Sequence, residues 1–404
     1  MREGFRFDNL FKLNKKPPEI GGQGGRLVYE EEKTTRHKSH QATAIVLVFL
    51  LGFIVTFGFV KKQAFIKEQP LIKLEKKADY VLAEIAGLAK VDSTRAMELG
   101  LDLKRSVEDS RKNIGDKQLL KRLESLQQKL DSVQSELGFV RQAKLSEFLD
   151  PNLLTEEIRA KTLAGNNESL LVFDDENNIL ATVSPVDRSG QVIGGGIEGI
   201  KSAALGRNSA FGIIENRIIE FPFNGGEPTE AVKEDGPWGA DSILFWFGGN
   251  LYVLDKSVSE VLKYQGGENN SDKPEFGSRR QWFKPGLNFD LSDAVATGVD
   301  GDIWVLHQGG RISRFRNGSR IYFRQVLTGF MSDPILFSVP QEGEKVWVLG
   351  RKDKKVTALN RETGEFAGLW EAEEFGKAQG LVVNEKLGKM FVLVEGKIYV
   401  ANTQ

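Results

Sequence analysis

The pentapeptide Asp-Ile-Trp-Val-Leu at residues 302–306 decides the fold, because variants of it recur along the C-terminal half of the chain. The variants are Asn-Leu-Tyr-Val-Leu at 250–254, Lys-Val-Trp-Val-Leu at 345–349 and Lys-Met-Phe-Val-Leu at 389–393. Their aromatic residues, Tyr252, Trp304, Trp347 and Phe391, are separated by 52, 43 and 44 residues. A period of about 43 residues, with three or four short strands in each unit, is typical of β-propeller blades.

Each pentapeptide has an apolar strand before it and an alternating strand after it. The preceding strands lie at 243–246, 294–297, 335–338 and 380–383, and the following strands at 259–264, 311–315, 355–359 and 397–400. A strand at the centre of a blade is buried on both faces, which explains why the pentapeptides are apolar without alternation. Two degenerate units, at 169–183 and 211–221, bring the prediction to about six blades.

Two irregularities of the repeat have simple explanations. The step of 52 residues contains a polar insertion at 266–279. The sequence given ends at Gln404, one strand short of a full last blade. Because an open ring would leave exposed strand edges, we expect a strand from 150–175 to complete that blade and close the ring.

The segment 295–306, Val-Ala-Thr-Gly-Val-Asp-Gly-Asp-Ile-Trp-Val-Leu, followed by Gly-Arg-Ile-Ser-Arg-Phe at 310–315, resembles the NHL/TolB-like propeller repeats. Those repeats combine an apolar strand, an Asp-Gly turn, an Ile-Trp-Val-like strand and an Arg-Ile-x-x-Phe-like strand. The resemblance covers 240–404 well and 165–235 poorly. The layout of the whole chain also resembles uncharacterised single-pass bacterial membrane proteins. The resemblance implies that proteins, glycans or other ligands bind on the faces of the ring, although a fold alone does not set a function.

An apolar run, ATAIVLVFLLGFIVTFGFV at 42–60, lies between basic residues near the N-terminus. It is long enough to cross the roughly 30 Å of bilayer hydrocarbon as a helix. We therefore predict a transmembrane helix at 41–61 that contacts the lipid bilayer and is not cleaved. The first 40 residues hold nine Lys and Arg and the 20 residues after the run hold six. Residues 22–41 hold only four, so the charge favours a cytoplasmic N-terminus only over the whole tail. Because large downstream domains translocate largely regardless of charge, we predict a flexible cytoplasmic tail at 1–40 and an extracytoplasmic propeller on a single-pass protein of the cell membrane.

Residues 64–163 are predicted to form a helical stalk between this run and a propeller at 164–404. Apolar residues from Leu71 to Leu88 recur every three or four positions, which indicates one seam of a helix. A second helix is expected to begin at Asp92 or Ser93, with a turn at 113–116. Heptad spacing from Leu119 to Val140 predicts a coiled-coil segment at 118–145. The seams either pack as an antiparallel hairpin within one chain or pair between chains as a homodimer.

Composition excludes several kinds of chemistry. The chain has no Cys, so disulfides, thiolate metal sites and Cys nucleophiles are absent. Its three histidines are His37, His40 and His307, which leaves a single imidazole for the propeller. The net charge of −1 gives no reason to expect a nucleic-acid partner.

Several polar motifs are candidate sites, and each also has a structural interpretation. His307 is either a ligand or base in the channel, or a polar side chain at a blade edge. Two acidic segments are either cation sites or β-turns, and a β-turn is the simpler interpretation. They are Asp300-Gly301-Asp302 and the stretch 174–178. The segment 279–284, Arg-Arg-Gln-Trp-Phe-Lys, binds an anionic polymer or forms an outer blade strand. The triplet Gly194-Gly195-Gly196 either binds a phosphate or connects two blade strands. No helix follows it whose N-terminus would bind a phosphate, which favours the connection.

The sequence favours a binding or scaffold module that is not an enzyme and needs no cofactor or metal. Its expected ligand on the propeller is a protein or a glycan. A lactonase-like, metal-assisted hydrolase is the alternative, because Asp241, Asp293 and Asp333 each precede a first strand, although Ala378 takes this place in the last unit. A single-pass sensor that relays binding through the stalk is a further alternative.

Overall fold

The computed structural model of the 404-residue chain describes residues 35–403, apart from 90, 138–139, 234, 267–275 and 326–332. The chain divides into two compact units, Met1–Glu68 and Gln69–Gln404. Most of the predicted tail at 1–40 and most of the predicted insertion at 266–279 lie outside the described residues.

The first helix, α1 (Thr35–Leu88), has 54 residues and contains the whole apolar run. Within the described residues, no helix combines the length and the apolar character that crossing a bilayer requires. The transmembrane helix predicted at 41–61 is therefore wrong. The run does not form a helix of its own: α1 continues from it through the charged residues Lys61 and Lys62 and through Pro70.

Two further helices follow at the places where the sequence predicts them. Helix α2 (Ser93–Asn113) is capped by Asp92, whose side chain accepts a hydrogen bond from the amide of Arg95. Helix α3 (Lys117–Glu136) is capped in the same way by Asp116. The turn between them confirms the predicted break at 113–116.

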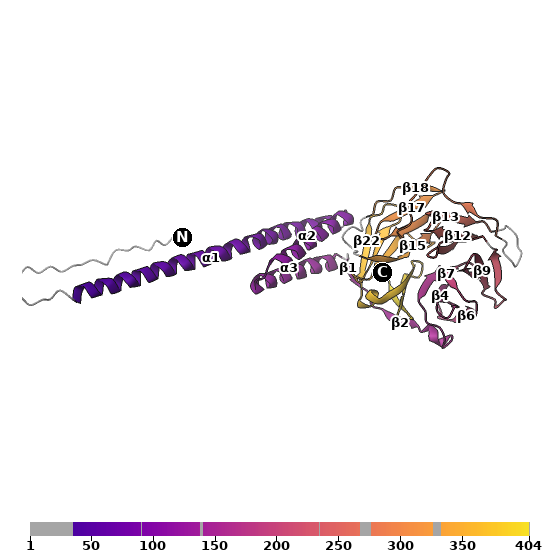
Figure 1. The fold of residues 1–404 in the computed structure, drawn as a ribbon, viewed down its shortest axis with the longest axis horizontal. Helices are drawn as coiled ribbons and strands as arrows, with labels where there is room; N and C mark the ends of the chain where they lie inside the picture. Colours follow the sequence, from indigo (N-terminus) through magenta and orange to yellow (C-terminus); the bar gives the residue numbers. More distant parts are fainter. Residues whose placement is uncertain are drawn as a thin grey trace, which may run out of the picture. The chain divides into compact units, whose positions relative to one another are not determined.

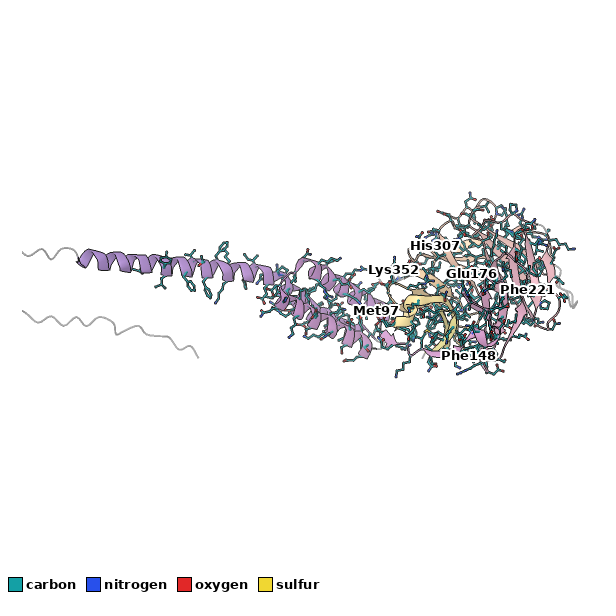
Figure 2. The ribbon with its side chains drawn as sticks, turned by 60° about the horizontal axis from the view of Figure 1, so that its bottom comes forward. Met97, Phe148, Glu176, Phe221, His307 and Lys352 are labelled. Carbon is teal, nitrogen blue, oxygen red and sulfur yellow. The ribbon has the colours of Figure 1, made fainter. Side chains whose placement is uncertain are left out.

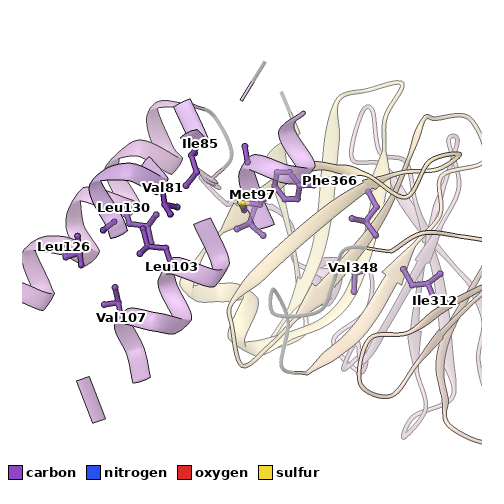
Figure 3. Close-up of a cluster of buried hydrophobic side chains, with 14 of the residues drawn as sticks. Val81, Ile85, Met97, Leu103, Val107, Leu126, Leu130, Ile312, Val348 and Phe366 are labelled. Atoms are coloured by element: carbon purple, nitrogen blue, oxygen red, sulfur yellow. The ribbon is translucent and has the colours of Figure 1, made fainter. Parts of the chain in front are cut away.

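The apolar seams of these helices pack together within one chain. Buried side chains from the second half of α1, from α2 and from α3 belong to a single cluster, which also includes residues of the propeller. Figure 3 shows Leu103, Leu126 and Leu130 on neighbouring helices of this cluster. The coiled-coil segment predicted at 118–145 is wrong, because α3 ends at Glu136 and its seam is already covered by α1 and α2.

The rest of the described chain forms six sheets, each containing four antiparallel strands in the order of a propeller blade. Figure 1 shows them arranged around an axis. The first three blades are β3–β6 (Thr162–Gly165, Leu170–Asp174, Ile179–Val183, Gly190–Gly194), β7–β10 (Ile200–Leu205, Ser209–Ile214, Arg217–Pro222, Thr229–Val232) and β11–β14 (Ile243–Phe247, Asn250–Asp255, Glu260–Tyr264, Arg280–Gln281). The next two are β15–β18 (Ala294–Val299, Ile303–His307, Ile312–Arg316, Ser319–Ile321) and β19–β22 (Pro334–Ser338, Lys345–Gly350, Lys355–Asn360, Phe366–Glu371).

The sixth blade closes the ring with strands from both ends of the propeller. Its strands β23 (Ala378–Asn384), β24 (Lys389–Val394) and β25 (Lys397–Asn402) are completed by β2 (Ser146–Leu149), which pairs antiparallel with β25. The need for a closing strand is confirmed, but that strand lies just before the expected range of 150–175. Six blades are therefore complete, as the repeat predicts.

The helices join the propeller through the fifth blade. Strand β1 (Val140–Gln142) lies within the predicted stalk, yet it pairs in parallel with β22 as a fifth strand of that blade. The buried hydroxyl of Thr94 in α2 accepts a hydrogen bond of 3.2 Å from the amide of Phe366, at the start of β22. Met97 lies where the helices meet the propeller (Figures 2 and 3).

Candidate functional site

The axis of the ring contains a cavity of about 360 Å³ that is lined by the first strands of all six blades. These strands are β3, β7, β11, β15, β19 and β23, and each contacts its neighbours around the axis. Of the described residues that line this channel, Lys201 is the only one with a charged side chain. The channel wall therefore combines apolar and neutral polar residues with one cation.

Four of the six first strands carry a β-bulge at the same place. In each of these first strands, one residue is skipped in the pairing with the second strand. The skipped residue directly follows the one that pairs with the last residue of the second strand. The bulge residues are Lys201, Val295, Ile335 and Gln379, and all four line the channel. Bulges redirect side chains and are common next to functional sites. The four side chains therefore gather at the end of the channel where the first strands begin.

The chemistry of the four bulge residues is uneven around the axis. Val295 and Ile335 lie on adjacent first strands, and Val295 is 37% exposed although it is apolar. Lys201 is exposed and makes no ion pair with a described residue. The side-chain oxygen of Gln379 accepts a hydrogen bond of 3.2 Å from the amide of Gly396, which leaves its NH2 group as a donor. The polar groups offered at this end are therefore hydrogen-bond donors beside an apolar wall.

A second set of polar residues lies at the ends of the second strands and has a structural role. Asp174 accepts a hydrogen bond of 2.6 Å from the amide of Arg159, which precedes the first strand of its blade. Asp255 accepts one of 3.2 Å from the amide of Gly239 in the equivalent loop. Both aspartates are buried. The acidic stretch at 174–178 is therefore a turn whose buried carboxylate fixes the incoming loop.

His307 occupies the same position in the fourth blade and makes a Ser–His–Asp arrangement. Its Nδ1 lies 2.5 Å from Asp293 Oδ1, and its Nε2 lies 3.0 Å from Ser313 Oγ. His307 is fully buried and Ser313 is 2% exposed. None of the three lines the channel, so a substrate has no access to the hydroxyl. The geometry matches a catalytic triad. Like Asp174 and Asp255, however, His307 is a buried, hydrogen-bonded side chain at the end of a second strand.

The pKa of His307 lies below its ordinary value of 6.5 because burial disfavours the charged ring. The hydrogen bond with Asp293 opposes this shift, while the nearby guanidinium of Arg311 adds to it. Arg311 Nη2 is 2.8 Å from the same ring nitrogen.

We expect the free energy of unfolding to fall as the pH drops below about 6.5, because the unfolded chain takes up a proton that folded His307 resists. The stabilising contribution of the neutral ring is complete above 6.5 and is lost as the pH approaches the lower folded pKa. NMR titration of the ring protons checks this, with a His307→Gln variant to assign the signal among the three histidines. A midpoint above 6.5 would contradict the prediction.

The turn at Asp300-Gly301-Asp302 is not available to a cation, because both of its carboxylates form ion pairs with arginines. Asp302 binds Arg314 Nε at 2.6 Å and Arg316 Nε at 2.8 Å, and it is 5% exposed. Asp300 pairs with Arg361 at 3.1 Å. Arg314 and Arg316 alternate on one strand and so share one face, which is the only sign of this network in the sequence.

The remaining sequence candidates are dispersed. In the segment 279–284, Phe283 is 5% exposed and packs on Phe315, while Arg279 pairs with Asp235 at 3.7 Å. This is the arrangement of an outer blade segment. Gly194 ends the outer strand β6 and packs against Phe221. Asp241 is 84% exposed, at 3.9 Å from Lys256.

The described residues contain no group of three or more His, Asp or Glu side chains arranged to hold a metal ion. Asp241, Asp293 and Asp333 do not line the channel.

Comparisons with known proteins identify no family for this chain. No family model matches it, and no curated protein matches it. Among solved structures, a nidogen/laminin complex is similar to it with a TM-score of 0.42 and 13% identity, over 56% of this chain and 85% of that one. A protein of unknown function from Bacteroides thetaiotaomicron has a TM-score of 0.42 and 11% identity, over 64% and 72% of the two chains.

The β-propeller domain of Myceliophthora thermophila Cps50 (Swd1) is similar with a TM-score of 0.41 and 10% identity. That match covers 61% of this chain and 96% of the other. Scores and identities at this level support no conclusion about function.

Proposed function

We propose that the propeller is a non-catalytic binding module whose partner protein docks over the end of the channel formed by the four bulge residues. The observation that carries the proposal is the repetition of the bulge. Four first strands break their ladder at the same place, and the residue at each break lines the channel. Such breaks cost ladder hydrogen bonds, so a shared bulge at one end of the ring is typical of a site that positions side chains.

The chemistry of these side chains selects the kind of group that binds. The Lys201 ammonium and the free NH2 of Gln379 can only donate hydrogen bonds in this arrangement. Val295 and Ile335 offer apolar contact from two adjacent first strands, and the strand of Ile335 also contacts that of Gln379. A carboxylate with an apolar neighbour fits this set, and a protein segment supplies both. A glycan, the other ligand expected from the sequence, fits the apolar wall less well.

We expect replacement of Lys201 by Glu to reduce partner binding by about tenfold or more, since a charge-assisted hydrogen bond contributes about 1.5–3 kcal/mol. The measurement is photo-crosslinking in cells from a benzoylphenylalanine placed at Val295. A discrete adduct should form with the native chain and fade with Lys201→Glu.

The matched control places the crosslinker at Tyr322, which is 87% exposed and does not line the channel. An adduct at Tyr322 that equals the one at Val295, or an adduct unaffected by Lys201→Glu, would contradict docking at the channel. The propeller's predicted extracytoplasmic location stays a prediction, which protease treatment of intact cells carrying a tag after Gln404 would check.

A further inference from the structure

A second cavity, of about 530 Å³, lies between the helices α2 and α3 and the outer strands of the fifth blade. We call it the helix–blade cleft. Its volume falls within the range of about 300–1,000 Å³ that is usual for small-molecule sites. It is separate from the channel and shares no lining residue with it.

One wall of the cleft is apolar and buried. Met97 is 1% exposed and Leu369 is 2% exposed, and both line the cleft together with Leu101 and Val140. Figure 3 shows Met97 between the helices and the blade. Because Met97 and Leu369 are already covered, the apolar surface open to a ligand comes from the half-buried Leu101 and Val140.

The cleft also contains a buried amide that lacks a strong partner. Gln134 in α3 is 5% exposed and lines the cleft. Its side-chain nitrogen lies 4.0 Å from the sulfur of Met97, a weak acceptor. No stronger acceptor for this nitrogen is found in the part of the chain that the structure describes. A buried amide is usually hydrogen-bonded, so Gln134 indicates a ligand with a polar group at this depth.

The charged residues of the cleft divide into paired and unpaired groups. On the blade, Lys355 and Glu371 form an ion pair at 2.9 Å, and Gln142 donates to Glu371 at 3.3 Å. On α2, Lys104 and Glu108 line the cleft but make no ion pair with any described residue. They are four positions apart and so lie on one face of the helix.

We infer that the helix–blade cleft binds a short zwitterion, an α-amino acid or dipeptide with an apolar side chain. Lys104 receives the ligand carboxylate and Glu108 receives its ammonium group. Gln134 hydrogen-bonds a polar group of the ligand, while Leu101 and Val140 contact its side chain. This arrangement gives Lys104 and Glu108 each a partner of opposite charge.

The test is calorimetric titration of the purified full chain with the dipeptide Leu-Leu and with L-leucine. We expect saturable binding of at least one probe. N-acetyl-leucine amide has the same apolar side chain but no charged ends, and we expect it to bind about tenfold more weakly or not at all, because charge-assisted hydrogen bonds contribute about 1.5–3 kcal/mol.

The variants Lys104→Met and Glu108→Gln should each weaken binding about tenfold or more for the same reason. Lys112→Met is the matched control, because Lys112 lies on the same helix, is 75% exposed and does not line the cleft. Gly100→Ala supplies a further variant: a Cβ there would meet the amide nitrogen of Gln134 at 2.6 Å and displace it. Absence of saturable binding, equal binding of the blocked probe, or equal effects of Lys104→Met and Lys112→Met would overturn the inference.

These outcomes are independent of the function proposed for the channel. Lys201→Met lies outside the cleft and should leave dipeptide binding unchanged.

Discussion

Replacing Asp302 by Ala is expected to lower the free energy of unfolding by about 3–5 kcal/mol, because it leaves a buried arginine without its main partner. Asp302 is 5% exposed and Arg314 is 4% exposed. Arg314 also lies over the ring of Trp304, at 4.5 Å from the centroid, so it cannot swing out without disturbing the core. Urea denaturation followed by tryptophan fluorescence measures the change.

Glu362→Ala is the matched control for this prediction. Glu362 binds the same arginine at 2.8 Å, but its side chain is 67% exposed. An exposed ion pair contributes at most about 1 kcal/mol. Equal losses in the two variants would show that burial of Asp302 does not make the difference.

Acid should weaken the same network. Burial raises the pKa of Asp302, but hydrogen bonds from Arg316 and Arg314 oppose it, and the net pKa lies below the ordinary value of 3.8. The stabilising contribution is therefore complete above 3.8 and is lost as the pH falls through the lower folded pKa. In Asp302→Asn this part of the acid denaturation should disappear, and a curve of unchanged shape would contradict the assignment.

The second large effect is expected at the closure of the ring. Phe148→Ala should cost about 3–5 kcal/mol, the usual range for removing a buried phenylalanine. Phe148 lies in β2, is 4% exposed, and packs edge-to-face on Phe391 at 5.0 Å between ring centroids. Because β2 completes the last blade, we also expect faster hydrogen exchange of amides in β25.

Leu153→Ala controls for the Phe148 experiment. Leu153 lies close to β2 in the sequence but is 79% exposed, so its loss should stay within about 0.5 kcal/mol. Hydrogen exchange that is unchanged across β25 in Phe148→Ala would show that β2 does not hold the ring closed.

Much of the fold could be predicted because it depends on local periodicity. The spacing of Tyr252, Trp304, Trp347 and Phe391 predicts the blades, and these aromatics lie in the second strands, buried on both faces. The start of α2 at Asp92 follows from capping and the break at 113–116 from a local turn, both of which involve only neighbouring residues. The extracytoplasmic location, the non-catalytic role and the identity of the ligand stay predictions.

The candidate sites were harder to predict because they depend on contacts between distant residues. Lys201, Val295, Ile335 and Gln379 have no common sequence motif, and only their register in four different blades places them together. The cleft requires α2 and α3 to pack against a blade more than 200 residues away, as the hydrogen bond between Thr94 and Phe366 shows. A pattern within one strand or helix carries no information about such a contact.

The sequence by itself determined that this chain contains a repeated, three- to four-stranded unit, two capped helices before it, and a ring that must be closed by an N-terminal strand. Those features follow from periodicities of side-chain burial and from the cost of an open strand edge. Only the tertiary structure decided that the seams of the helices are covered within one chain, that β1 joins a blade, and that Asp302 is held by arginines. The reason is physical: which apolar face covers which, and which charges are paired when buried, depends on the three-dimensional register of segments far apart in the chain.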